Sequence, residues 1–132
     1  MAVVSELIRM EGNGSVSFGD YSQTEKKKHE DGAYKVKTFQ EITRLEKDGE
    51  LVYESTPGTA VLSLAETADG MTFSVEGPED ADITVGLEPE TEYQVSLEGE
   101  AIGTLKTNLG GKLTFSVELD AGKAVAVEVK KA

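Results

Sequence analysis

The sequence predicts an all-β protein: an antiparallel β-sandwich of immunoglobulin-like or jelly-roll-like type, with about eleven short strands and no long helix. Two observations support this. Turn signals recur at short intervals, and the runs between them alternate apolar and polar residues. The clearest alternation places Leu113, Phe115 and Val117 on one face. A chain of 132 residues suits a single domain spanning residues 1–132, with the turn at 55–58 as the best internal boundary.

In the first half of the chain, apolar and polar residues alternate less regularly. Leu7 and Ile8 are adjacent apolar residues, which indicates a bulge or a strand buried on both faces. The polar segment 19–32 is expected to be a long exposed loop. Asp48-Gly49 predicts a hairpin, while a capping-box pattern at 38–41 leaves one helical turn near 38–42 as the alternative. Strands are expected in residues 2–10, 15–18, 34–37, 42–47 and 50–55.

The second half is more regular. Asp69-Gly70 and Glu98-Gly99 each predict a hairpin, because Xaa-Gly pairs between alternating runs favour tight turns. Residues 86–97 read as a corner followed by a buried strand, in which the Tyr93 hydroxyl bonds back to upstream backbone. Strands are expected in residues 60–64, 71–76, 83–87, 93–97, 102–107, 113–119 and 125–129.

Composition excludes several classes of function. The net charge of −12 would repel nucleic acid and an anionic membrane surface. The absence of cysteine rules out disulfides and cysteine-based zinc sites. The N-terminus lacks the pattern of a secretory signal peptide, and no apolar run is long enough for a membrane span. The default expectation is therefore a cytoplasmic protein.

No residue pattern points to catalysis. His29 lies in a hydrophilic stretch and is expected to be solvated rather than a general base. No Gly-Xaa-Ser-Xaa-Gly elbow accompanies it. The acidic residues at 76–82 lack the spacing of a calcium loop and are interpreted as a charged turn. We expect no catalytic residue, no metal and no cofactor.

Seven of the eight aromatic residues fall into two sets. Four fall on predicted inward faces and are expected in the core: Phe18, Phe73, Tyr93 and Phe115. The others are predicted to be more exposed and are the candidate ligand contacts: Tyr21, Tyr34 and Tyr53.

Two resemblances add to this interpretation. Residues 87–93 resemble the Leu-Xaa-Pro-Xaa-Thr-Xaa-Tyr corner of fibronectin type III domains, which implies an immunoglobulin-like sandwich. Residues 34–46, 53–59 and 107–113 are similar to a group of short bacterial proteins often labelled "endosialidase". That label implies sialoside chemistry, but sialidases typically clamp the sugar carboxylate with three arginines, and this chain has only Arg9 and Arg44.

The sequence therefore predicts a non-enzymatic binding or structural module for protein–protein interaction or self-association through exposed strand edges. The alternative is a carbohydrate-binding or glycosidase-related protein that recognises sialosides, with Tyr21, Tyr34 and Tyr53 beside acidic groups as its site. The expected partner is a protein or a second copy of the chain, with carbohydrate as the alternative and neither nucleic acid nor membrane.

Overall fold

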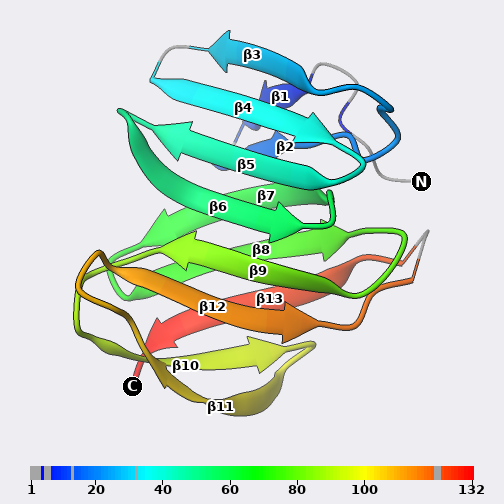
Figure 1. Cartoon of the computed structure of the whole chain (residues 1–132). Helices are drawn as coiled ribbons and strands as arrows, with labels where there is room; N and C mark the ends of the chain where they lie inside the picture. Colours follow the sequence, from blue (N-terminus) through cyan, green and yellow to red (C-terminus); the bar gives the residue numbers. More distant parts are fainter. Residues whose placement is uncertain (1–3, 5–6, 13, 32, 121–122) are drawn as a thin grey trace.

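The computed structural model describes residues 4, 7–12, 14–31, 33–120 and 123–132. These residues form thirteen strands in two antiparallel sheets and no helix (Figure 1). The predicted all-β sandwich is confirmed, although the strands outnumber the eleven expected. Within the described part of the chain, no helix is long and apolar enough to cross a membrane.

Sheet A has seven strands and sheet B has six. In spatial order, sheet A consists of β1 (Ile8–Met10), β2 (Val16–Phe18), β7 (Ala60–Thr67), β8 (Gly70–Glu76), β13 (Val125–Lys131), β10 (Glu92–Leu97) and β11 (Glu100–Lys106). Sheet B consists of β12 (Lys112–Val117), β9 (Ala81–Gly86), β6 (Glu50–Thr56), β5 (Ile42–Lys47), β4 (Tyr34–Phe39) and β3 (Lys27–Asp31).

The chain alternates between hairpins within a sheet and crossings between sheets. Strands β3 to β6 form a continuous meander in sheet B, which lies in front of sheet A in Figure 1. The chain crosses between the sheets after β2, β6, β8, β9, β11 and β12. The edge strands of sheet B are β12 and β3, and those of sheet A are β1 and β11.

The core lies between the two sheets. The four aromatic residues predicted to be inward-facing are all buried, with exposed fractions from 0% to 6%, so that prediction is confirmed. One hydrophobic cluster includes residues from before and after the turn at 55–58, such as Leu45 and Ile83. The Thr56–Pro57 peptide bond within this turn is cis.

All three predicted hairpins form, but only two have the expected turn residues, because the turn between β7 and β8 is made by residues 68–69 and Gly70 already belongs to β8. Asp48 and Gly49 have φ angles of 52° and 82°, and Glu98 and Gly99 have φ angles of 51° and 81°. Positive φ at both central residues is the requirement of a type I′ turn, which matches the twist of the flanking strands. Residues 38–42 form the end of β4, a two-residue turn and the start of β5. The alternative of a helical turn there is therefore wrong.

Two expectations for the N-terminal half need correction. Part of the predicted loop 19–32 is strand β3, which pairs along its whole length with β4. Its lysines mask the strand in the sequence, because charged edge strands lack apolar alternation. The strand expected at 2–10 is described only as β1, and Val3 lies outside the described residues. Leu7 precedes β1 with a φ of 70°.

The predicted corner connects sheet B to sheet A. The backbone N–H of Glu88 donates to the Tyr93 hydroxyl at 3.2 Å, as expected from the sequence. Thr107 closes the corner from the opposite side, because its hydroxyl donates to the Glu88 carbonyl at 2.6 Å and accepts from the Thr91 N–H at 2.9 Å. Tyr93 itself is only 1% exposed.

Substituting Tyr93→Phe should lower the free energy of unfolding by about 1 kcal/mol, because the Glu88 N–H loses its acceptor. Urea unfolding followed by circular dichroism measures this loss. Tyr34→Phe is the matched control, since the Tyr34 hydroxyl makes no hydrogen bond among the described residues. Equal stability of both variants would mean that the corner is only a turn.

Candidate functional site

The three tyrosines proposed as ligand contacts do not form one surface. Tyr53 is 0% exposed, and its ring packs edge-on against Phe18 and Phe73 at centroid distances of 5.3 and 5.5 Å. Tyr21 is 5% exposed. The expectation that these two side chains are exposed is therefore wrong. Only Tyr34 is half-buried, with the Lys47 ammonium 5.5 Å from its ring centroid.

A bulge explains the burial of Tyr53. Leu45 is opposite Tyr53, but the next residue of β5, Glu46, is opposite Leu51, so Val52 is an extra residue in β6. Bulges break the strict alternation of strand faces. Val52 and Tyr53 are consequently both buried, which period-two alternation does not predict.

Tyr21 participates in a buried polar pair rather than in a ligand site. Its hydroxyl donates to the Glu76 carboxylate at 3.1 Å, and Glu76 is 1% exposed. Burial, together with the hydrogen bond to Glu76 and the negative charges of Glu76 and Asp20, raises the pKa of Tyr21 to about 12. Tyr21 therefore stays protonated and connects the loop after β2 to the end of β8.

The acidic residues at 76–82 have separate structural roles. Glu76 accepts from Tyr21, Asp80 accepts from the Leu119 N–H at 3.1 Å, and Asp82 accepts from the Ser116 hydroxyl at 2.6 Å. Across the described residues, no group of three His, Cys, Asp or Glu side chains is placed to hold a metal ion.

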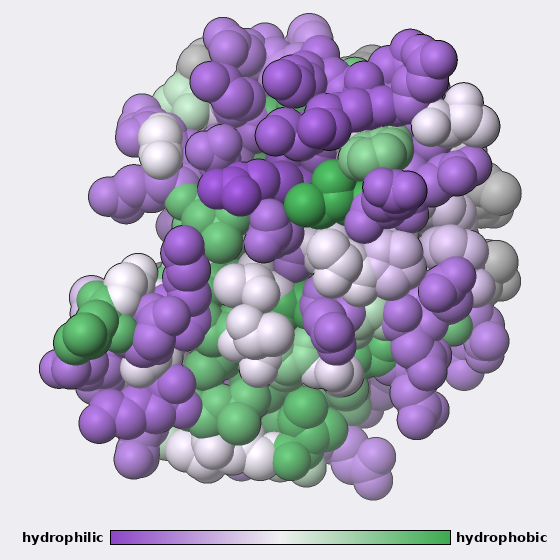
Figure 2. Space-filling model, in the orientation of Figure 1, coloured by the Kyte–Doolittle hydropathy of each residue, from purple (hydrophilic) through white to green (hydrophobic). Residues whose placement is uncertain are grey.

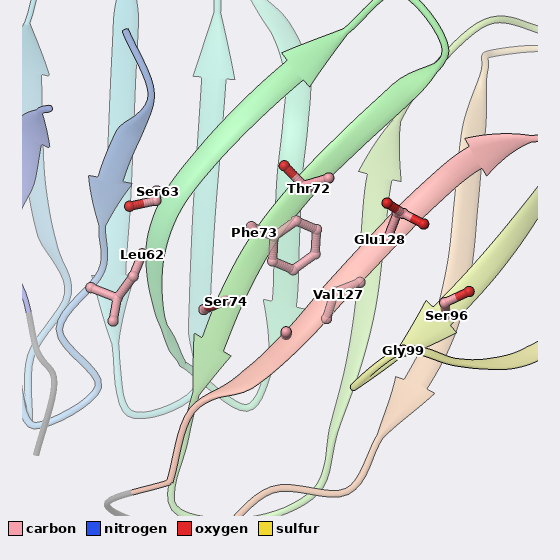
Figure 3. Close-up of a pocket in the computed structure, with 10 residues that line it drawn as sticks. Leu62, Ser63, Thr72, Phe73, Ser74, Ser96, Gly99, Val127 and Glu128 are labelled. Carbon is pink, nitrogen blue, oxygen red and sulfur yellow. The ribbon is translucent and has the colours of Figure 1, made fainter. Parts of the chain in front are cut away.

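A shallow pocket of about 410 Å³ lies on the outer face of sheet A (Figure 3). Thr72 on β8 is opposite Glu128 on β13, which is in turn opposite Ser96 on β10, and Ser74 also lines the pocket. Phe73 also lines the pocket, but this residue is only 4% exposed. The pocket thus offers hydroxyl groups and one carboxylate, without an aromatic platform for a sugar ring.

The outer face of sheet B has a more unusual arrangement of charge. Lys28 on β3 is directly opposite Lys37 on β4, and Lys37 is directly opposite Arg44 on β5. We call these three residues the basic row. Like charges directly opposite each other in a sheet are destabilising, by roughly 0.2–1 kcal/mol per pair. A surface selected only for stability would avoid this row.

The adjacent rows balance their charges. Lys35 lies between Glu30 and Glu46 in the register, and its ammonium is 3.5 Å from the Glu30 carboxylate. Arg44 is also neutralised, because its Nη1 is 3.1 Å from the Glu54 carboxylate and its Nε is 3.7 Å from the Glu46 carboxylate. Lys28 and Lys37 form no ion pair with any described residue. The unbalanced charge of this face is therefore concentrated on the two lysines.

The basic row also stands out against the whole chain. Residues 26–47 contain seven of the 13 basic residues but only four of the 25 acidic ones. The row borders a pocket of about 570 Å³ formed by β3, β4 and β5. Figure 2 shows mostly hydrophilic residues over these strands in the upper part of the molecule, and a mixture of apolar and hydrophilic residues in the lower part. The protein is acidic overall, with one basic region.

The basic row was missed by sequence reasoning. The sequence predicts an exposed loop for the lysines at 26–28 and does not indicate that Lys37 and Arg44 lie beside them. The alternation around Val36 does place Lys35 and Lys37 on one outer face. Their opposite neighbours depend on the register with β3 and β5, which the local sequence does not specify. His29 is exposed as predicted, although it lies in a strand rather than a loop.

Comparison with known proteins adds no assignment: no protein-family model, curated protein or solved structure matches this chain.

Proposed function

We propose that this chain is a non-enzymatic binding module that holds an acidic segment of a partner protein against the basic row. The supporting observation is the run of three directly opposed positive charges on the outer face of sheet B. Carboxylates of a partner would offset the repulsion between Lys28 and Lys37, so binding would relieve a strain present in the free protein.

The proposal predicts a variant that gains stability while losing binding. Lys37→Glu places a negative charge between Lys28 and Arg44, so the row alternates in sign. The free energy of unfolding should rise by about 0.5 kcal/mol. Affinity for a glutamate-rich peptide should fall about tenfold or more, and the wild-type affinity should weaken steeply with added salt.

Fluorescence anisotropy of a labelled glutamate-rich peptide measures binding, and urea unfolding measures stability. Lys130→Glu is the matched control, since it reverses the charge of an exposed lysine on sheet A. This control should bind less than twofold more weakly, because it lies on the other sheet. Binding that is lost equally in both variants would reflect net charge alone and would reject the basic row as the site.

The sialoside hypothesis remains the alternative proposal. A sialic acid has a carboxylate that the basic row and its pocket could attract, which is the specific observation in its favour. Against it, Arg9 lies on β1 of sheet A and pairs with Glu11, so the two arginines do not converge on one sugar. The immunoglobulin-like topology and the endosialidase-like resemblance likewise remain proposals. A sialoside array and a turnover assay with the Lys37→Glu variant test this alternative.

A further inference from the structure

We infer that β3 is a pairing edge for a second copy of this chain, in an antiparallel arrangement centred on His29. The inference goes beyond the proposed function, because it concerns the open backbone edge of β3 rather than the outer face of the sheet. Strand β3 is the last strand of sheet B and, among the residues that the structure describes, pairs only with β4. Its other edge is therefore available for strand addition.

The sequence of β3, Lys-Lys-His-Glu-Asp, is self-complementary in charge. When two copies pair antiparallel about His29, Lys28 of each copy lies opposite Glu30 of the other, and position 27 lies opposite position 31. Each pair of positions joins a basic residue to an acidic one. Directly opposed residues share a face, so Lys28 and Glu30 of the second copy would both lie on the outer face of a continuous sheet.

Within residues 27–31, only this register places both lysines opposite acidic residues. A shift of two residues in one direction places Lys28 opposite Lys28 of the second copy, and a shift in the other direction places Glu30 opposite Glu30. Both shifts bring like charges together, which is destabilising. An edge strand whose charges were all positive would repel a second copy. Strand β3 changes from basic to acidic along its length, and this change favours one antiparallel register.

The new pairing would also continue the basic row. Lys28 has Lys37 as its like-charged neighbour within the chain. Glu30 of the second copy would supply an opposite charge on the open side of Lys28. Glu30 of the second copy would therefore offset part of the positive charge of the basic row, which is unbalanced in the free protein.

The other edge strands are less suitable for charge-matched self-pairing. Strand β12 is regular, but it has no acidic residue to place opposite its single lysine. Strand β11 contains a bulge opposite β10, and Gly103 within it has a φ of 151°, so its edge is irregular. Strand β1 has only three residues. The five residue pairs between β3 and β4 follow in register without a shift, which leaves β3 regular. A short edge of this kind suits a weak dimer, with a Kd on the order of 0.1–1 mM.

Charge-swap variants test the inference. We expect the wild-type mass, measured by sedimentation equilibrium at up to about 1 mM protein, to rise toward that of a dimer. Lys28→Glu alone places Glu opposite Glu30 of the second copy, and Glu30→Lys alone places Lys opposite Lys28, so each single variant should stay monomeric. An equimolar mixture of these two variants should associate again, because in the mixed dimer each Lys of β3 lies opposite an acidic residue. The double variant should also associate.

Other outcomes would overturn the inference. A wild-type protein that stays monomeric rejects it, and so do single variants that associate as strongly as the wild type, or a mixture that stays monomeric. Circular dichroism of each variant verifies folding. The Lys37→Glu variant separates this inference from the proposed function: it should lose the glutamate-rich peptide but keep self-association, since it leaves β3 unchanged. Peptide binding that fails while the charge-swap mixture associates rejects only the proposed function.

Discussion

Substituting Tyr53→Ala should lower the free energy of unfolding by about 3–5 kcal/mol. The Tyr53 ring is fully buried between the sheets and packs edge-on against Phe18 and Phe73 with interplanar angles of 73° and 86°. Removing the ring leaves a cavity that the neighbouring strands can fill only in part, because both sheets are fixed by their own ladders. Urea unfolding followed by circular dichroism measures the loss.

The variant Tyr53→Phe distinguishes the contribution of the ring to stability from that of the hydroxyl. The Tyr53 hydroxyl bonds to the Thr59 hydroxyl at 2.8 Å, and the Thr59 hydroxyl also contacts the Ser55 hydroxyl at 2.8 Å. Tyr53→Phe should therefore cost only about 1 kcal/mol, since Thr59 keeps one partner. If the phenylalanine and alanine variants were equally unstable, the packing of the ring would not be the main contribution of this residue.

Thr43→Val should be a second strongly destabilising change, by about 3–5 kcal/mol in total. The Thr43 hydroxyl donates to the Thr59 carbonyl at 2.7 Å and accepts from the Thr59 N–H at 3.0 Å. It also bonds to the Thr38 hydroxyl at 2.9 Å, where Thr38 must donate because the single Thr43 proton is already used. Valine has nearly the same shape but satisfies none of these three buried groups.

Thr43→Ser is the matched control for this prediction. Serine keeps the hydroxyl and loses one methyl group, so the expected cost is about 1 kcal/mol. Thermal and urea unfolding should rank the serine variant well above the valine variant. The opposite ranking would mean that the methyl group, rather than the hydrogen bonds to Thr38 and Thr59, makes the main contribution of Thr43 to stability.

Local chemistry made much of the fold predictable. The Asp48-Gly49 and Glu98-Gly99 turns need only two residues with positive φ, and such residues can be recognised in a sequence. The alternation of Leu113, Phe115 and Val117 places these side chains inside without reference to any other strand. The Tyr93 corner likewise depends on residues five positions apart.

The candidate sites were much less predictable, because they depend on contacts between distant residues. The sequence predicts an exposed Tyr21, but this residue is buried and its hydroxyl donates to Glu76, 55 positions away. Tyr53 was expected to be exposed, but an extra residue in β6 turns it inward. The Thr43 hydrogen bonds join β5 to the segment between β6 and β7, and no local pattern indicates them.

The sequence by itself therefore determined the fold class, the hairpins, the corner and most of the core, since period-two alternation and turn preferences act over a few residues. Only the tertiary structure decided that residues 27–31 form an edge strand, and that Lys28, Lys37 and Arg44 lie opposite one another. The physical reason is register. Which side chains meet across a sheet depends on how separate strands align, and that alignment is fixed by the packing of the whole sandwich.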